Sequence, residues 1–223
     1  MVSKADLQPP AAAGVTNRPT PRTAFTIPVR TSAGTAYLVG RVTRTIRTSV
    51  GLVRPVTPLG NETWLPIVKY KGRFGTALVV TPSGQREAKV DLAQLSLRWT
   101  AARVDVDLSQ LRLSVLRGDR VLARFKVAAG GPGTPTPSGR FFVTDRVTFP
   151  TGSPYGEFAL GLSVDQAQPT PGWTGGDQVA IHGTSNPETI GTYASLGCVR
   201  VSAEALKLLF SAMPLGAPVT IHA

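Results

Sequence analysis

The sequence predicts a mostly β protein with one short helix. Its 223 residues include 19 prolines and 23 glycines, and turn-forming residues at this frequency leave little room for long helices. Runs of Val, Thr, Ile and Leu alternate with polar residues in the manner of half-buried strands. An apolar content of 42% is enough for a buried core. Together these observations favour short strands over a helical bundle.

Composition divides the chain into three parts. Residues 1–22 are small and proline-rich, which predicts a flexible tail. Residues 23–100 predict a small, basic, β-rich module, called the N-terminal module below. Residues 101–223 predict a second β domain, which holds every candidate catalytic residue.

In the N-terminal module, alternation predicts that Leu38, Val42 and Ile46 share one face of a half-buried strand. Further along, 64–70 and 74–80 predict two strands of a hairpin, joined at a turn-forming Lys-Gly pair. A Pro-Ser-Gly turn follows the second strand, so the hairpin pattern continues.

The second domain begins with another predicted hairpin. Residues 104–115 are taken as its first strand, Gly118 and Asp119 as its turn, and 121–127 as its return strand. Glycines and prolines in 130–139 then interrupt regular structure and predict an exposed loop before the next strand.

One segment near the end of the chain predicts a helix, over Ala203 to Met213. Ser202 is a good N-cap, Glu204 suits the positive helix start, and Pro214 ends the helix. Its apolar stripe consists of Leu206, Leu209, Phe210 and Met213. We expect this helix to support the sheet.

Charge is concentrated in the first part of the chain. Residues 1–100 hold 14 Lys and Arg against 4 Asp and Glu, whereas residues 101–223 hold 10 against 9. A basic face attracts polyanions, such as anionic wall polymers, acidic lipid or nucleic acid. Nucleic-acid binding needs aromatic residues interleaved with arginine, and Tyr37 and Tyr70 are too sparse for it. We also expect no integral membrane segment, since no apolar run is long enough, and no export signal in this chain.

Cys198 is the only cysteine, and His182 is one of two histidines. A lone cysteine is either core filler or a nucleophile, and it cannot form an internal disulfide. A neighbouring imidazole can remove the thiol proton and thereby activate the sulfur. The second histidine, His222, lies far along the chain and receives no role. One cysteine and two distant histidines make a poor metal site, so we expect no metal and no cofactor.

The residues around this pair suit attack on a carbonyl group. Gly197 lets the backbone approach a substrate closely, so that main-chain N–H groups of Gly197 and Cys198 can form an oxyanion hole. The turn at Gly183 and Thr184 offers a carbonyl or hydroxyl oxygen to orient the His182 ring. An active nucleophile of this kind is expected to have a depressed thiol pKa.

The spacing from His182-Gly183-Thr184 to Ser195-Leu196-Gly197-Cys198-Val199-Arg200 resembles the signature of the YkuD-type L,D-transpeptidases. Residues 133–141, the pair Tyr155 and Gly156, and Trp173 with the glycines after it resemble the same family, so the likeness covers 101–223. Many members carry a second histidine where this chain has Leu196. We interpret this departure as a less polar pocket.

The resemblance implies a YkuD-like catalytic β-sandwich without metal or cofactor. It also implies that Cys198 attacks a peptidoglycan stem tetrapeptide, that His182 moves the proton, and that a thioester forms as the terminal D-residue leaves. An amine from a second stem then makes the cross-link, whereas water would give L,D-carboxypeptidase activity. Carbapenems are expected to acylate the same thiol. The implied substrate-binding residues are Arg200, Ser195, Tyr155, Thr184 and Trp173.

Two further expectations accompany this interpretation. The protein would act in the cell envelope outside the cytoplasmic membrane, and the basic N-terminal module would hold it against anionic wall polymers. A different class of function stays open, a non-catalytic wall-binding module that keeps the fold and has lost the chemistry. The departure at Leu196 is its only support.

Overall fold

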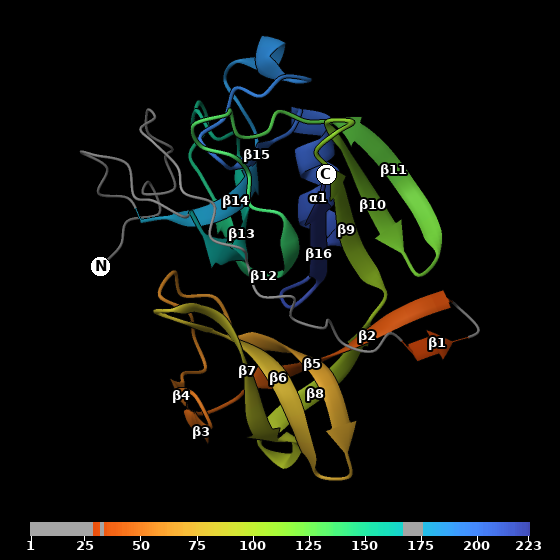
Figure 1. Ribbon diagram of the computed structural model, residues 1–223, viewed down its shortest axis with the longest axis vertical. Coiled ribbons are helices and arrows are strands. Elements are labelled where there is room, and N and C mark those ends of the chain that lie inside the picture. Colours follow the sequence, from red (N-terminus) through yellow and green to blue (C-terminus); the bar gives the residue numbers. More distant parts are fainter. Residues whose placement is uncertain (1–28, 32–33, 167–175) are drawn as a thin grey trace.

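The computed structural model describes residues 29–31, 34–166 and 176–223, which form two β-sheets lying one above the other (Figure 1). The predicted mostly β fold with one short helix is confirmed. The predicted tail, residues 1–22, lies outside the described residues. None of the described helices is long and apolar enough to cross a membrane.

The first sheet has six strands in the order β1-β2-β5-β6-β7, with β8 paired to β2. A separate hairpin, β3–β4, and a 3₁₀ turn, η1, complete this part of the chain. The elements are β1 (Val29–Thr31), β2 (Gly34–Val42), β3 (Ile46–Thr48), β4 (Gly51–Val53), β5 (Trp64–Lys71), β6 (Phe74–Thr81), β7 (Gly84–Asp91), η1 (Leu92–Gln94) and β8 (Leu95–Thr100).

Both predicted hairpin turns of this sheet are confirmed. Gly72 and Gly84 have φ values of +56° and +90°, which glycine adopts without steric cost, at the β5–β6 and β6–β7 turns. The single strand predicted to hold Leu38, Val42 and Ile46 is wrong. β2 ends at Val42 and Ile46 begins β3, although all three side chains are buried in one cluster.

The second sheet has eight strands in the order β11-β10-β9-β16-β12-β13-β14-β15. Its elements, with one helix and the 3₁₀ turn η2, are β9 (Ala102–Asp107), β10 (Arg112–Arg117), β11 (Arg120–Lys126), β12 (Gly139–Thr148), β13 (Phe158–Asp165), β14 (Gln178–His182), η2 (Pro187–Thr189), β15 (Val199–Arg200), α1 (Ala203–Ala212) and β16 (Pro218–His222).

The strand predicted over 104–115 is two strands, β9 and β10. The Asp107 carboxylate accepts hydrogen bonds from the Ser109 hydroxyl and the Gln110 N–H, at 2.7 and 2.9 Å, which closes a turn. Leu111 completes the reversal with φ +46°. The apolar alternation continues through this turn because both strands bury the same face, so periodicity alone missed the break.

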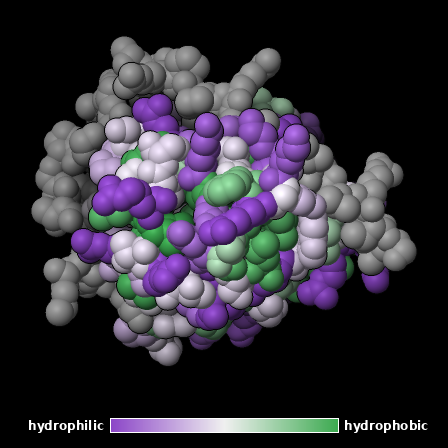
Figure 2. Space-filling model, turned by 90° about the horizontal axis from the view of Figure 1, so that it is seen from below, coloured by the Kyte–Doolittle hydropathy of each residue, from purple (hydrophilic) through white to green (hydrophobic). Residues whose placement is uncertain are grey.

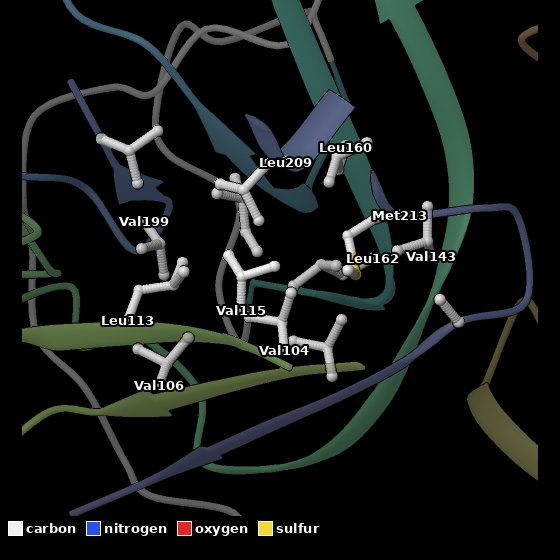
Figure 3. Packing of buried hydrophobic residues seen from close by; sticks show 14 of the residues in the cluster. Val104, Val106, Leu113, Val115, Val143, Leu160, Leu162, Val199, Leu209 and Met213 are labelled. Atoms are coloured by element: carbon white, nitrogen blue, oxygen red, sulfur yellow. The ribbon is translucent and has the colours of Figure 1, made fainter. Parts of the chain in front are cut away.

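The eight-stranded sheet curls until its two halves face each other across one core (Figure 3). Val104 and Leu113 from one half pack with Leu160 and Val199 from the other, and Leu209 of α1 fills the space between them. The predicted sandwich is thus a single folded sheet.

The helix α1 matches its prediction closely. The Ser202 hydroxyl caps it by accepting the Ala205 N–H, and Pro214 follows its C-terminal end. Its apolar stripe faces the core between the two halves of the sheet.

Polar and apolar contacts join the two sheets. The Ser163 hydroxyl donates to Gln85 Oε1 at 2.6 Å and accepts the Phe142 N–H at 3.0 Å. The Phe142 ring forms a buried cluster with Val68 and Leu78 of the N-terminal module. Because these side chains are buried on both sides, the module is packed firmly against the second sheet.

Candidate active site

The register of two parallel strands brings Cys198 and His182 together. β14 pairs with β15 so that Ile181 lies opposite Val199 and His182 opposite Arg200. Cys198, one residue before β15, therefore lies beside Ala180, whose N–H donates to the sulfur at 3.4 Å. Side chains two residues apart on a strand point to the same face. The thiol and the imidazole therefore lie on one face of the sheet, and no hydrogen bond joins Nε2 to the sulfur within the described residues.

A backbone carbonyl fixes the tautomer of His182. Nδ1 lies 2.6 Å from the carbonyl oxygen of Gly183. Since a carbonyl only accepts, Nδ1 carries the proton, and Nε2 of the neutral ring holds a free lone pair. Nε2 is buried and has no hydrogen-bond partner within the described residues. The acceptor expected in this turn is therefore present, and Nε2 is the ring nitrogen that can accept a proton.

Burial keeps both members of the pair uncharged. It lowers the pKa of His182 to about 4, against the opposing effect of the Gly183 hydrogen bond. It raises the pKa of the Cys198 thiol, while the Ala180 N–H and the positive charge of Arg200 lower it. The expected depressed thiol pKa is wrong for this structure, because desolvation outweighs the two favourable contacts. At pH 7 the site holds a neutral thiol and a neutral imidazole.

Tyr155 adds a second unpaired polar atom to the site. Its ring meets the His182 ring edge to face, with centroids 5.2 Å apart, and its other neighbour is Phe149 at 5.3 Å. The Tyr155 hydroxyl is buried without a partner in the described part of the chain. Burial, with a smaller effect of Cys198, raises its pKa to about 12, so it is a hydrogen-bond donor at neutral pH.

Apolar side chains surround the sulfur. Cys198 is 5% exposed and clusters with the buried Val147, Ala159 and Ala180. Leu59 and Phe149 pack against this cluster and are only partly buried. The sulfur is thus beside buried apolar side chains and two that keep some exposed surface.

The loop before Cys198 is held by its own side chains and by Gln166. The Ser195 hydroxyl donates to the Cys198 carbonyl at 2.5 Å and accepts the Gly197 N–H at 3.1 Å. Gln166 Nε2 donates to the Leu196 carbonyl at 2.6 Å. Gly197 has φ +117°, and a Cβ there would lie 1.2 Å from Gln166 Nε2, so only glycine fits.

A second loop braces the first. The Gly131 N–H donates to the Ser195 carbonyl at 3.0 Å, and the Ser195 N–H donates to the Ala129 carbonyl at 2.9 Å. The Gly130 N–H donates to the buried hydroxyl of Thr136 at 2.8 Å. The prediction of an exposed loop over 130–139 is therefore only partly right, since Gly130 and Thr136 are buried and Gly131 is bonded to the loop of Cys198, while Pro132, Pro135 and Ser138 are exposed.

Comparison with known proteins decides the family. Residues 101–221 match the family model of the YkuD domain, described as the L,D-transpeptidase catalytic domain. The chain belongs to this family.

Curated relatives of the YkuD domain agree. The chain is similar to proteins named L,D-transpeptidase YkuD from Bacillus subtilis (strain 168), at 32% identity over 119 residues, and from Bacillus licheniformis, at 33% over 119 residues. Each alignment covers 53% of this chain, and 65% and 64% of the respective relative. The chain thus spans slightly less than two thirds of the length of these proteins.

Solved structures also align with this chain, at low identity. An L,D-transpeptidase from Xylanimonas cellulosilytica aligns with TM-score 0.40 and 23% identity, covering 55% of this chain and 61% of that one. An L,D-transpeptidase from Enterococcus faecium aligns with TM-score 0.45 and 19% identity, covering 81% and 75%.

The four remaining predicted residues of the YkuD domain are placed differently. The Arg200 guanidinium influences the pKa values of both Cys198 and His182, so it lies near the pair. Ser195 is 2% exposed, and its hydroxyl is bonded within the loop that precedes Cys198. Thr184 is partly exposed and accepts the Asn186 N–H at 3.0 Å. Trp173 lies outside the described residues.

Sequence reasoning missed the supporting residues of the YkuD domain. Gln166 and Gly130 are not adjacent to the His182 or Cys198 motifs, and nothing in their own sequence context indicates a contact with the loop of Cys198; Thr136 lies in the family-like stretch 133–141, but its bond to Gly130 was not predicted. No cluster of three or more metal-ligating side chains occurs among the described residues.

Proposed function

We propose that this protein is an L,D-transpeptidase that cross-links peptidoglycan stem peptides through a thioester on Cys198. The observation that carries the proposal is the arrangement of the pair: a neutral imidazole lies on the same face of the sheet as the only thiol, and its Nε2 is unprotonated and has no hydrogen-bond partner among the described residues. General-base activation of a thiol needs such a base beside it, and the proposed mechanism brings Nε2 within hydrogen-bond reach of the sulfur.

In the first half-reaction, Nε2 of His182 takes the thiol proton as the Cys198 sulfur attacks a stem-peptide carbonyl. The S–C bond forms and the carbonyl oxygen becomes an oxyanion. As the oxyanion collapses, the C–N bond breaks and the imidazolium gives its proton to the leaving amine, so the terminal D-residue departs and a thioester remains.

In the second half-reaction, the amine of a neighbouring stem attacks the thioester. His182 takes a proton from that amine, the new C–N bond forms, and the S–C bond breaks to regenerate the thiol. When water takes the place of the amine, the product is a trimmed stem, and the enzyme acts as an L,D-carboxypeptidase.

Main-chain and side-chain donors would stabilise the oxyanion. Of the two N–H donors expected from the sequence, that of Gly197 is already bonded to the Ser195 hydroxyl. We therefore assign the oxyanion contact to the other, the Cys198 N–H. The unpaired hydroxyl of Tyr155 is a second candidate donor, and Arg200 is suited to a substrate carboxylate.

Incubation with a defined stem tetrapeptide tests the reaction class. Mass spectrometry of the products is expected to show loss of the terminal D-residue, with a cross-linked dimer when an acceptor stem is present. The Cys198→Ala variant is the control and is expected to leave the peptide intact. An unchanged tetrapeptide with the wild-type protein would support a wall-binding module without catalysis.

The N-terminal module supports an anionic wall polymer as partner. Exposed apolar side chains gather between hydrophilic ones on its outer face (Figure 2). Tyr70, Leu97 and Trp99 line a groove of about 580 Å³ together with Arg73 and Arg98. Aromatic and apolar surface beside cations suits a polymer with sugar rings and acidic groups. A peptidoglycan substrate would place the protein in the cell envelope, outside the cytoplasmic membrane.

A further inference from the structure

A small hairpin of the N-terminal module reaches the YkuD domain. Between β4 and β5, Val56 pairs with Glu62 and the Thr63 N–H donates to the Pro55 carbonyl at 2.9 Å. The tip is closed by a hydrogen bond from the Gly60 N–H to the Thr57 carbonyl at 3.0 Å, and Gly60 has φ +80°. This is a tight turn followed by a left-handed glycine, which fixes the direction of the tip.

Hydrogen bonds to a buried carboxylate hold the hairpin in place. The Thr57 hydroxyl and the Asn61 side-chain amide donate to Asp145 Oδ1 at 2.5 and 3.1 Å. The Arg146 N–H donates back to Asn61 Oδ1 at 3.2 Å. Asp145 belongs to β12 and is 3% exposed, so these charge-assisted contacts are shielded from water.

The side chain at the tip of the hairpin is Leu59. It packs against the apolar cluster that contains Cys198, and with Phe149 it is one of the two partly buried members. The other members of the cluster are almost fully buried, so Leu59 and Phe149 are the members that keep some exposed surface and can touch an approaching group. Phe149 contacts Tyr155, whose ring contacts His182, so a row of rings connects Phe149 with the imidazole.

We propose that Leu59 is a specificity-determining residue of the active site: with Phe149 it forms an apolar subsite at the entrance to Cys198 that binds the uncharged aliphatic side chain flanking the scissile bond. Leu59 and Phe149 are apolar, and so are the buried cluster members apart from the thiol, so a charged group placed among them would be costly to bury. The inference rests on the proposed function. It gives the N-terminal module a direct part in substrate selection.

The size of the side chain at position 59 determines how large an aliphatic substrate side chain the subsite accepts. Shortening Leu59 to alanine opens the entrance, and enlarging it to phenylalanine narrows it. A difference of a few methylene groups in an apolar pocket changes specificity by about tenfold or more. Leu52, exposed on the neighbouring β3–β4 hairpin, is the matched control in the same module.

Alkylation of Cys198 tests the subsite without requiring turnover. The rates with iodoacetamide and with its N-cyclohexyl derivative are measured by intact mass for the wild type, Leu59→Ala, Leu59→Phe and Leu52→Ala. The alkylation rate with the N-cyclohexyl derivative is divided by the rate with iodoacetamide. This ratio of rates is expected to rise about tenfold in Leu59→Ala and to fall in Leu59→Phe. Leu52→Ala is expected to match the wild type. Equal ratios in all four proteins would overturn the proposal.

Tetrapeptide donors that differ in the residue beside the scissile bond then extend the test. In Leu59→Ala, kcat/KM is expected to shift toward the larger aliphatic residue. If the wild type turns over no donor, the proposed function fails, while the alkylation ratios still decide the role of Leu59. If the wild type is active and Leu59→Ala keeps the same donor preference, the inference about Leu59 fails alone.

Discussion

Protonation of His182 should make the protein unstable in acid by a predictable amount. Burial holds the pKa of His182 near 4 in the folded state, whereas the unfolded value is 6.5. The unfolded chain therefore binds more protons below pH 6.5, and stability falls as the pH drops from about 6.5 to about 4. At 1.36 kcal/mol per pKa unit, the loss at pH 4 is about 3 kcal/mol. This corresponds to roughly 6–12 °C in Tm for a chain of this size.

The assay compares the wild type with His182→Gln, which cannot titrate, by urea unfolding at pH 7 and pH 4. The loss of stability between the two pH values is expected to be about 3 kcal/mol smaller in the variant. His222→Gln is a control with the opposite expected pH effect. The Ala223 carbonyl and Asp105 raise the pKa of His222, so the protonated His222 stabilises the fold at low pH, and this contribution is lost at high pH. Identical pH dependence in the wild type and His182→Gln would refute the reasoning.

Three further predictions concern the loops and the module. Gly130→Ala places a Cβ 2.1 Å from the Thr134 carbonyl oxygen and is expected to destabilise the fold by about 1–3 kcal/mol in thermal unfolding, whereas Gly131→Ala, 3.2 Å from its nearest atom, has a smaller effect. Gln166→Ala removes the hydrogen bond to the Leu196 carbonyl, and this change is expected to slow carbapenem acylation about tenfold. The pH dependence of acylation is expected to stay the same, and a shifted pH profile would contradict a positioning role for Gln166. Binding to isolated wall is expected to weaken steadily as salt rises, and salt-independent binding would exclude charge as its cause.

Much of the fold was predictable because local rules decide it. The turn glycines of the β5–β6–β7 meander and the cap of α1 act within a few residues, so sequence alone indicates them. The turn after Asp107 was missed because its signal is a side-chain hydrogen bond inside an unbroken apolar alternation. Hydrophobic periodicity therefore predicts where strands occur, but it does not reveal a turn that leaves the periodicity unbroken.

The candidate site shows the same division. Each of the two motifs, around His182 and around Cys198, is a short continuous stretch of sequence that can be recognised by itself. The parallel pairing of β14 with β15 brings the two stretches together. Gln166, Asp145 and Leu59 act only through contacts made across the folded molecule, so no motif marks them. The raised thiol pKa also depends on burial, which a sequence pattern cannot measure.

The measurement that tests the central claim most directly is intact mass after exposure to a carbapenem. The account predicts one covalent adduct on the wild type, none on Cys198→Ala, and much slower formation on His182→Ala, because Nε2 of His182 is the base for the thiol. An adduct on Cys198→Ala, or equal rates with and without His182, would contradict it.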